Sequence, residues 1–145
     1  MSKIKVQQPV IHLPKVKEYQ IASADLRRLI SSLPVKWRNI DLEDRYYFYT
    51  DWESWGKVTE YLKPKVPKYL TDKFDCDNFA RWFNSEVARI FELNTCAIVE
   101  GWLGSARHKW NIIYDGKGFY QMEPQTGVII DLPDDSYKPD EILVG

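Results

Sequence analysis

Residues 75–93 constrain the fold more than any other part of the chain. Their apolar side chains recur at intervals of three and four, which indicates one face of an amphipathic helix. Asp72 or Asp75 can cap the start of this helix, and Asn94 can end it. A helix with such a stripe needs an apolar partner surface. The stripe consists of Cys76, Phe79, Ala80, Phe83, Val87, Ile90 and Phe91.

The segment after residue 95 supplies that partner, because its apolar period changes to two, which is typical of β-strands. The expected strands are 96–102, 109–114, 119–123 and 128–131, with a turn at 115–118. Strands joined by short turns pair antiparallel. The predicted fold class is therefore α+β, with helices packed on an antiparallel sheet of about four strands.

Two shorter helices are expected upstream of the long one. Ser23 precedes an amphipathic segment that stops before Pro34, and Ser23 is its predicted cap. Thr50 and Glu53 have capping-box spacing at the start of the second helix. The aromatic run at 46–49 is typical of a strand or a packed loop.

The ends of the chain are expected to lie outside the central part of the domain, which we place at about 70–130. Pro9 and Pro14 indicate an extended arm at 1–16, with a short strand at 4–6. The acidic segment 133–145 carries two prolines and is expected to be a surface tail. The length of 145 residues predicts a single domain, 1–145.

Composition narrows the class of partner. With 20 basic and 21 acidic residues the net charge is −1, so no nucleic acid is expected as a partner. No apolar run approaches the roughly 18 residues of a membrane span, and the first residues lack a signal peptide's apolar block. We therefore expect no membrane partner and a cytoplasmic protein with reduced thiols. The oligomeric state is left open.

Cys76 is the first candidate for chemistry. A thiol is a nucleophile only as the thiolate, and the free N–H groups of a helix N-terminus lower a thiol pKa. Cys76 lies in the first turn of the predicted long helix. It also belongs to the apolar stripe of that helix, so an ordinary buried cysteine is the alternative interpretation.

His108 and Glu123 follow from the register of the predicted hairpin. If the turn centres on residues 116–117, Trp110 faces Glu123 and His108 faces Gln125. Glu123 then lies diagonally from His108 on the same face, within reach of a long side chain. Such a carboxylate can fix the tautomer of the ring and leave its other nitrogen for Cys76.

Three sequence blocks resemble the papain-like and transglutaminase-like cysteine-enzyme superfamily. They are the segments that begin at Asp75-Cys76-Asp77-Asn78, His108-Lys109-Trp110-Asn111 and Glu123-Pro124-Gln125-Thr126. The nearest likeness is to the calcium-dependent C-terminal protease domain of a mushroom agglutinin and its bacterial and bacteriophage relatives. The resemblance implies a papain-like fold and a possible bacteriophage origin.

The resemblance implies that Cys76 is the nucleophile, His108 the general base and then acid, and Glu123 the residue that orients His108. The protein would be a cysteine hydrolase, a peptidase that works through a thioester, or a transglutaminase-like acyltransferase. A peptide or protein would be its substrate. Trp110 and Trp102 are the expected substrate-binding residues.

Calcium is the expected cofactor by the same resemblance. The matching positions are Asp77, Asn78 and Gln125, and carboxylate and amide oxygens suit a hard cation. Asn78 departs from the family, where a second acid is expected, and this lowers the ligand charge. Alternatively, Asp77 and Asn78 only complement the helix dipole.

Two other functions fit the same residues. One is a non-catalytic module that binds a peptide or a glycan in an aromatic groove. Its aromatic residues would be Tyr46, Tyr47, Tyr49, Trp52, Trp55 and Trp102. The other is a calcium-binding structural or regulatory protein with a vestigial triad.

Overall fold

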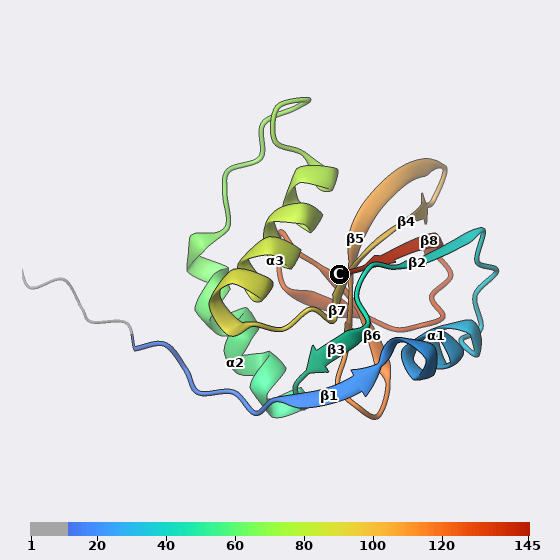
Figure 1. The fold of residues 1–145 in the computed structure, drawn as a ribbon. Helices are drawn as coiled ribbons and strands as arrows, with labels where there is room; N and C mark the ends of the chain where they lie inside the picture. Colours follow the sequence, from blue (N-terminus) through green and yellow to red (C-terminus); the bar gives the residue numbers. More distant parts are fainter. Residues whose placement is uncertain (1–11) are drawn as a thin grey trace, which may run out of the picture.

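The computed structural model describes residues 12–145, which form two sheets and three α-helices (Figure 1). The strand expected at 4–6 and most of the arm at 1–16 lie outside the described residues. The helices are α1 (Ser23–Ser31), α2 (Trp52–Leu62) and α3 (Cys76–Phe91), with a 3-10 turn at Lys63–Lys65. The strands are β1 (Tyr19–Ala22), β2 (Asn39–Leu42), β3 (Tyr46–Tyr49), β4 (Cys96–Leu103), β5 (Ala106–Tyr114), β6 (Phe119–Glu123), β7 (Val128–Ile130) and β8 (Tyr137–Val144).

The main sheet has six strands in the order β2-β8-β4-β5-β6-β7, and β1 pairs with β3 in a separate two-stranded sheet. Only the β2–β8 pair is parallel, so the main sheet is mixed. The predicted fold class, α+β of papain-like type with an antiparallel sheet of about four strands, is therefore wrong. The chain is mainly β-sheet with three short helices.

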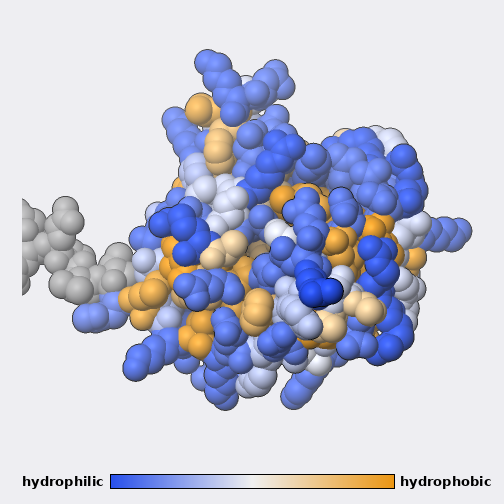
Figure 2. Space-filling model, in the orientation of Figure 1, coloured by the Kyte–Doolittle hydropathy of each residue, from blue (hydrophilic) through white to orange (hydrophobic). Residues whose placement is uncertain are grey.

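The larger sheet separates two apolar cores. One face carries Ala97, Val99 and Ile112 against α1 and Tyr47, while the other carries Cys96, Ile113 and Met122 against α2 and α3. Neighbours along a strand point to opposite faces, so the two-residue period of β4 and β5 supplies both cores. On the face in Figure 2, hydrophobic residues gather in separate groups among hydrophilic ones.

The C-terminal segment corrects a second expectation. Residues 137–144 form β8, which lies between β2 and β4 and is no surface tail. Pro139 lacks an N–H and is normally excluded from a central strand. It is accommodated because the β4–β8 register shifts between Glu100 and Gly101: Glu100 pairs with Glu141 and Gly101 with Pro139, which leaves Asp140 as an extra residue.

The helix caps follow the predictions in part. Asp75 caps α3, and the Asn78 side chain accepts a hydrogen bond from the Asp75 N–H, which completes a capping box. In α2 the cap is Asp51, which accepts from the Ser54 N–H, while the hydroxyl of the predicted cap Thr50 is buried without a partner. Helix α3 ends at Phe91, followed by Glu92 in the left-handed conformation.

The hairpin of β5 and β6 has the register that the sequence predicted. Tyr114 pairs with Phe119, and the ladder continues to Asn111 opposite Met122. Asp115 stabilises the turn, because its carboxylate accepts hydrogen bonds from the Lys117 and Gly118 N–H groups. This register brings the start of β5 close to the end of β6.

Candidate functional site

A hydrogen-bonded group of three side chains brings together residues of β5, β6 and β8. The His108 Nε2 atom is 2.9 Å from each carboxylate oxygen of Glu123. The Tyr137 hydroxyl donates to Glu123 Oε2 at 3.0 Å. Burial and the Glu123 charge raise the pKa of Tyr137 to about 12. Glu123 therefore has two partners that hold it in place, of which the sequence predicted only His108.

Trp110 packs against this group from the core of the protein. Its side chain is fully buried, and its ring stacks against His108 at 5.6 Å between centroids. The indole N–H donates to Gln121 Oε1 at 2.9 Å, and the Gln121 amide donates to the Asp131 carbonyl. Trp110 is thus a core residue in this structure and does not line a surface where a substrate would bind.

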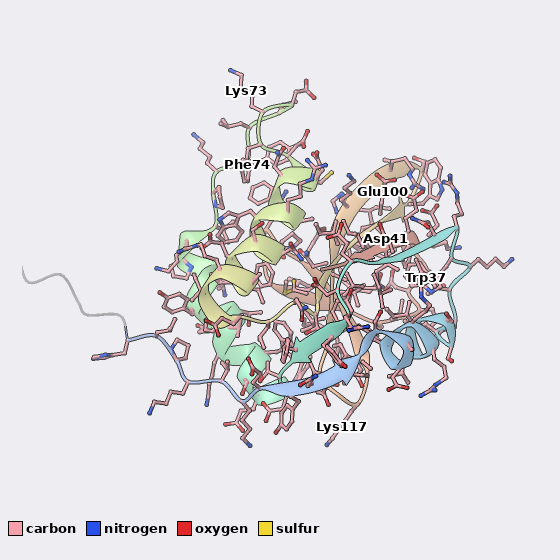
Figure 3. All side chains as sticks on the ribbon, viewed as in Figure 1. Trp37, Asp41, Lys73, Phe74, Glu100 and Lys117 are labelled. Atoms are coloured by element: carbon pink, nitrogen blue, oxygen red, sulfur yellow. The ribbon has the colours of Figure 1, made fainter. Side chains whose placement is uncertain are left out.

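Cys76 and His108 line the same hollow, of about 260 Å³, together with Asp77, Glu100, Arg107 and Lys109. Figure 3 shows Phe74, just before α3, and Glu100, on β4, to either side of the start of that helix. Cys76 is half-buried. Within residues 12–145, no hydrogen bond joins the Cys76 thiol to the His108 ring. The structure thus brings the three predicted catalytic residues to one region and directly pairs two of them.

The residues predicted to bind calcium have other contacts. Asp77 forms an ion pair with Arg81, and the amide oxygen of Asn78 serves the α3 cap. Gln125 is exposed beyond the end of β6. A carboxylate oxygen from each of Asp75 and Asp77 lies within 4.8 Å of the Cys76 sulfur and of the other carboxylate.

The close contact of these two carboxyl groups changes their acidity in opposite directions. Their mutual hydrogen bond raises the pKa of Asp75 and lowers that of Asp77.

Calcium binding stays a prediction. A rise in the Tm of the protein at millimolar calcium would test it, because a ligand that binds only the folded state stabilises it.

A larger hollow, of about 510 Å³, lies beside Trp102 at the far end of β4. The Trp102 side chain is 45% exposed. Pro133, Tyr137 and Pro139 form apolar walls, and Asp135 and Lys138 add charged groups. We call this the Trp102 hollow. Tyr137 also reaches Glu123, so the hollow adjoins the His108 group.

The other aromatic residues of the predicted groove do not form one surface. Tyr47 and Trp55 are fully buried, and Tyr49 packs against Tyr19 and Tyr114. Trp52 is 48% exposed but contacts the Tyr120 ring at the start of α2. Tyr46 is also exposed, on β3. Of the six aromatic residues in the predicted groove, Trp102 alone lines the Trp102 hollow.

Tyr137 and most of the residues that line the Trp102 hollow were not predicted from the sequence. They belong to 132–140, most of which was assigned to a surface tail because of its prolines and acidic residues. The alternation of Tyr137, Pro139 and Glu141 with charged or apolar neighbours is a weak strand signal. Nothing in the sequence around Tyr137, which follows Asp134 and Asp135, indicates its contact with Glu123.

Comparison with known proteins gives a fold and no family. No family model matches the chain, and no curated protein matches it. A solved structure described as "PSL1a-E64 complex" has a TM-score of 0.70 and 20% identity over 86% of this chain and 51% of that chain. A structure of Polyporus squamosus lectin bound to a human-type influenza-binding epitope, Neu5Aca2-6Galb1-4GlcNAc, has a TM-score of 0.70 and 18% identity.

The second match covers 86% of this chain and 49% of the lectin, so the chain spans about half the length of the structures it resembles. At this identity the likeness establishes the fold alone, which is shared with about half of each of these structures. It contradicts the assignment to the papain-like and transglutaminase-like superfamily and, with it, the predicted cysteine peptidase or acyltransferase.

Proposed function

We propose that this chain is a non-catalytic glycan-binding module and that the Trp102 hollow is its binding site. The observation that carries the proposal is the exposure of Trp102, 45%, at a hollow of about 510 Å³. Exposed aromatic side chains occur elsewhere on this chain, but Trp102 lines a hollow, where its ring can pack against a ligand. Ligand sites are concave and mostly apolar, with a few polar groups that fix orientation.

The chemistry of the Trp102 hollow suits a sugar. A sugar ring has an apolar C–H face that packs on an aromatic ring and hydroxyl groups at its edge that need hydrogen-bond partners. Trp102 and the prolines offer the apolar surface, while Asp135, Lys36 and Lys138 are exposed and offer polar groups.

Asp134 completes the wall in a different way. One of its carboxylate oxygens accepts hydrogen bonds from the Ser136 and Tyr137 N–H groups, at 2.8 and 3.2 Å. This turn fixes the loop that leads into β8. The Asp134 carboxylate therefore holds the loop that forms part of the lining, which supports a preformed site.

The similar lectin structure supports the class of ligand, since that protein is described with a bound sialylated trisaccharide. The lectin is about twice as long as the part that this chain matches, so its glycan does not locate a site here. The location rests on Trp102 alone.

Other partner classes have no support. The net charge of −1 gives no general attraction to nucleic acid, and no helix among residues 12–145 is long and apolar enough to cross a membrane. The cytoplasmic location and the single-domain organisation stay predictions.

A titration with defined glycans tests the proposal. We expect the protein to bind either Neu5Aca2-6Galb1-4GlcNAc or its asialo form saturably. NMR chemical shifts measure this binding, and a glycan array confirms it. Trp102→Ala should weaken binding at least about tenfold, because a central aromatic anchor supplies a large share of the binding energy. Trp52→Ala is the matched control, because Trp52 is equally exposed but lies outside the hollow.

Two results would overturn the proposal. One is the absence of binding to every glycan on the array by a protein whose fold is intact. The other is cleavage of a peptide by the wild-type protein that disappears in Cys76→Ala, since a module without catalysis has no use for that thiol.

A further inference from the structure

The Arg107 side chain contacts the Trp102 ring of the proposed glycan site. Arg107 on β5 pairs directly with Trp102 on β4, and its guanidinium carbon lies 5.0 Å from the centroid of the indole ring. A guanidinium over an aromatic face is attracted by the ring and also packs flat against it. Within residues 12–145, no aromatic ring stacks on Trp102, and the Arg107 guanidinium lies over its face.

The guanidinium is itself held by two carboxylates from two other strands. It donates to both oxygens of Asp140 on β8, at 2.7 and 2.9 Å, and to Glu100 Oε2 on β4, at 2.8 Å. A forked contact to a carboxylate fixes the plane of the guanidinium as well as its position. The plane that faces the Trp102 ring is therefore defined by hydrogen bonds.

The irregular pairing of β4 and β8 makes this arrangement available. Asp140 is the extra residue where the register shifts, and a bulge redirects the side chain at that point. The Arg38 N–H donates to the Asp140 carbonyl at 2.7 Å, so the bulge is anchored from the neighbouring segment as well. Both terminal nitrogens of Arg107 are engaged by carboxylates, and Arg107 lines the hollow of Cys76 and His108 and not the Trp102 hollow, so it would act on a ligand there through Trp102.

We propose that Arg107, fixed by Asp140 and Glu100, is a positioning residue that holds the Trp102 indole as the preformed platform of the glycan site. The proposal rests on the proposed function for its ligand, but the orientation of Trp102 can be tested without any ligand. A platform fixed in advance binds more tightly, because less side-chain entropy is lost on binding.

The first measurement follows the Trp102 indole N–H signal in a nitrogen-15 NMR spectrum of the free protein, assigned by its loss in Trp102→Phe. We expect Arg107→Lys to shift and broaden this signal, because lysine keeps the charge but has no planar fork. Asp140→Asn should have a similar, smaller effect. Arg89→Lys is the matched control, since Arg89 forms a two-nitrogen contact with Glu86 on α3.

The second measurement is the affinity for N-acetyllactosamine and for its sialylated form. Arg107→Lys should weaken binding roughly threefold to tenfold, with Arg89→Lys unchanged. An unchanged Trp102 signal in a folded Arg107→Lys protein overturns the positioning role, whatever the glycan result. Failure of the wild-type protein to bind any glycan overturns the proposed function, and the Trp102 signal then decides the positioning role alone.

Discussion

The Asp140 carboxylate contacts two arginine side chains from different segments. It accepts hydrogen bonds from both terminal nitrogens of Arg107. One carboxylate oxygen also lies 3.9 Å from a terminal nitrogen of Arg38. The side chain is only 14% exposed, so these contacts are partly shielded from solvent. The Arg107 guanidinium is the main reason that the pKa of Asp140 lies below its usual value, and it lowers the pKa of Glu100 in the same way.

The lowered pKa values predict a specific pH dependence of stability. A carboxyl group with a lower pKa in the folded state stabilises the fold at pH values above its unfolded pKa, near 4, and loses this contribution as the pH falls through its folded pKa. We expect Asp140→Asn to cost roughly 1–3 kcal/mol at neutral pH and much less in strong acid.

Denaturant unfolding at several pH values measures this difference. Asp25→Asn is the control, because Asp25 pairs with Arg28 on the open surface of α1, where an ion pair contributes little. A penalty for Asp140→Asn that stays constant from neutral pH down to pH 2 would contradict the assignment.

Strand β8 has the largest gap between what the sequence indicated and what the structure shows. Pro139 and the acidic residues of 133–145 concealed it, because a proline argues against a central strand unless a bulge is known to be there. The bulge depends on Gly101, which no local pattern links to residue 139. Helix α3 and the β5–β6 register were predictable, since each follows from a period or a turn within a short segment.

In the candidate site, too, contacts within a short segment were predictable and contacts between distant segments were not. The contact between His108 and Glu123 was predictable from the hairpin, because both residues belong to one local unit. Tyr137, Arg107 and Asp140 were not, because their contacts depend on the pairing of β8 with β4. Sequence likeness in three short blocks also led to the wrong class of protein.

Gly101, the one glycine of the β4–β8 pair, should be sensitive to substitution. A Cβ atom at this position would clash with the carbonyl oxygen of Lys138, a backbone atom that cannot turn away. We expect Gly101→Ala to destabilise the protein by about 1–3 kcal/mol, measured by denaturant unfolding.

Gly56→Ala provides the opposite control. Gly56 lies within α2 and a Cβ atom there meets nothing within 4 Å, so alanine should stabilise the protein by about 0.5–1 kcal/mol. Equal stability of the two variants would show that the close approach of β4 and β8 is not a constraint.

The whole molecule is organised by the strands that both cores share. Residues of β4 and β5 contribute to the core under α1 and, through their alternate side chains, to the core under α2 and α3. Neither core can lose its sheet face without exposing the other. Cys96 is fully buried in the second core, and this burial raises the pKa of its thiol well above the ordinary value.

Shared strands predict a single cooperative unfolding transition. Far-ultraviolet circular dichroism, tryptophan fluorescence and the reaction of Cys96 with a thiol reagent should give the same denaturant midpoint, with Cys76→Ala used so that only Cys96 reacts. A separate, earlier midpoint for Cys96 would show that the core under α2 and α3 opens independently.

The place of β8 between β2 and β4 has a consequence for the order in which the molecule can form. Residues 137–144 leave the ribosome after every other described strand, yet β2 reaches the sheet only through them. During synthesis, β2 must therefore wait for a neighbour about a hundred residues downstream, while the hairpin of β5 and β6 can form from local contacts. Nascent chains that stop short of residue 137 should need a chaperone to shield the exposed edge of β4.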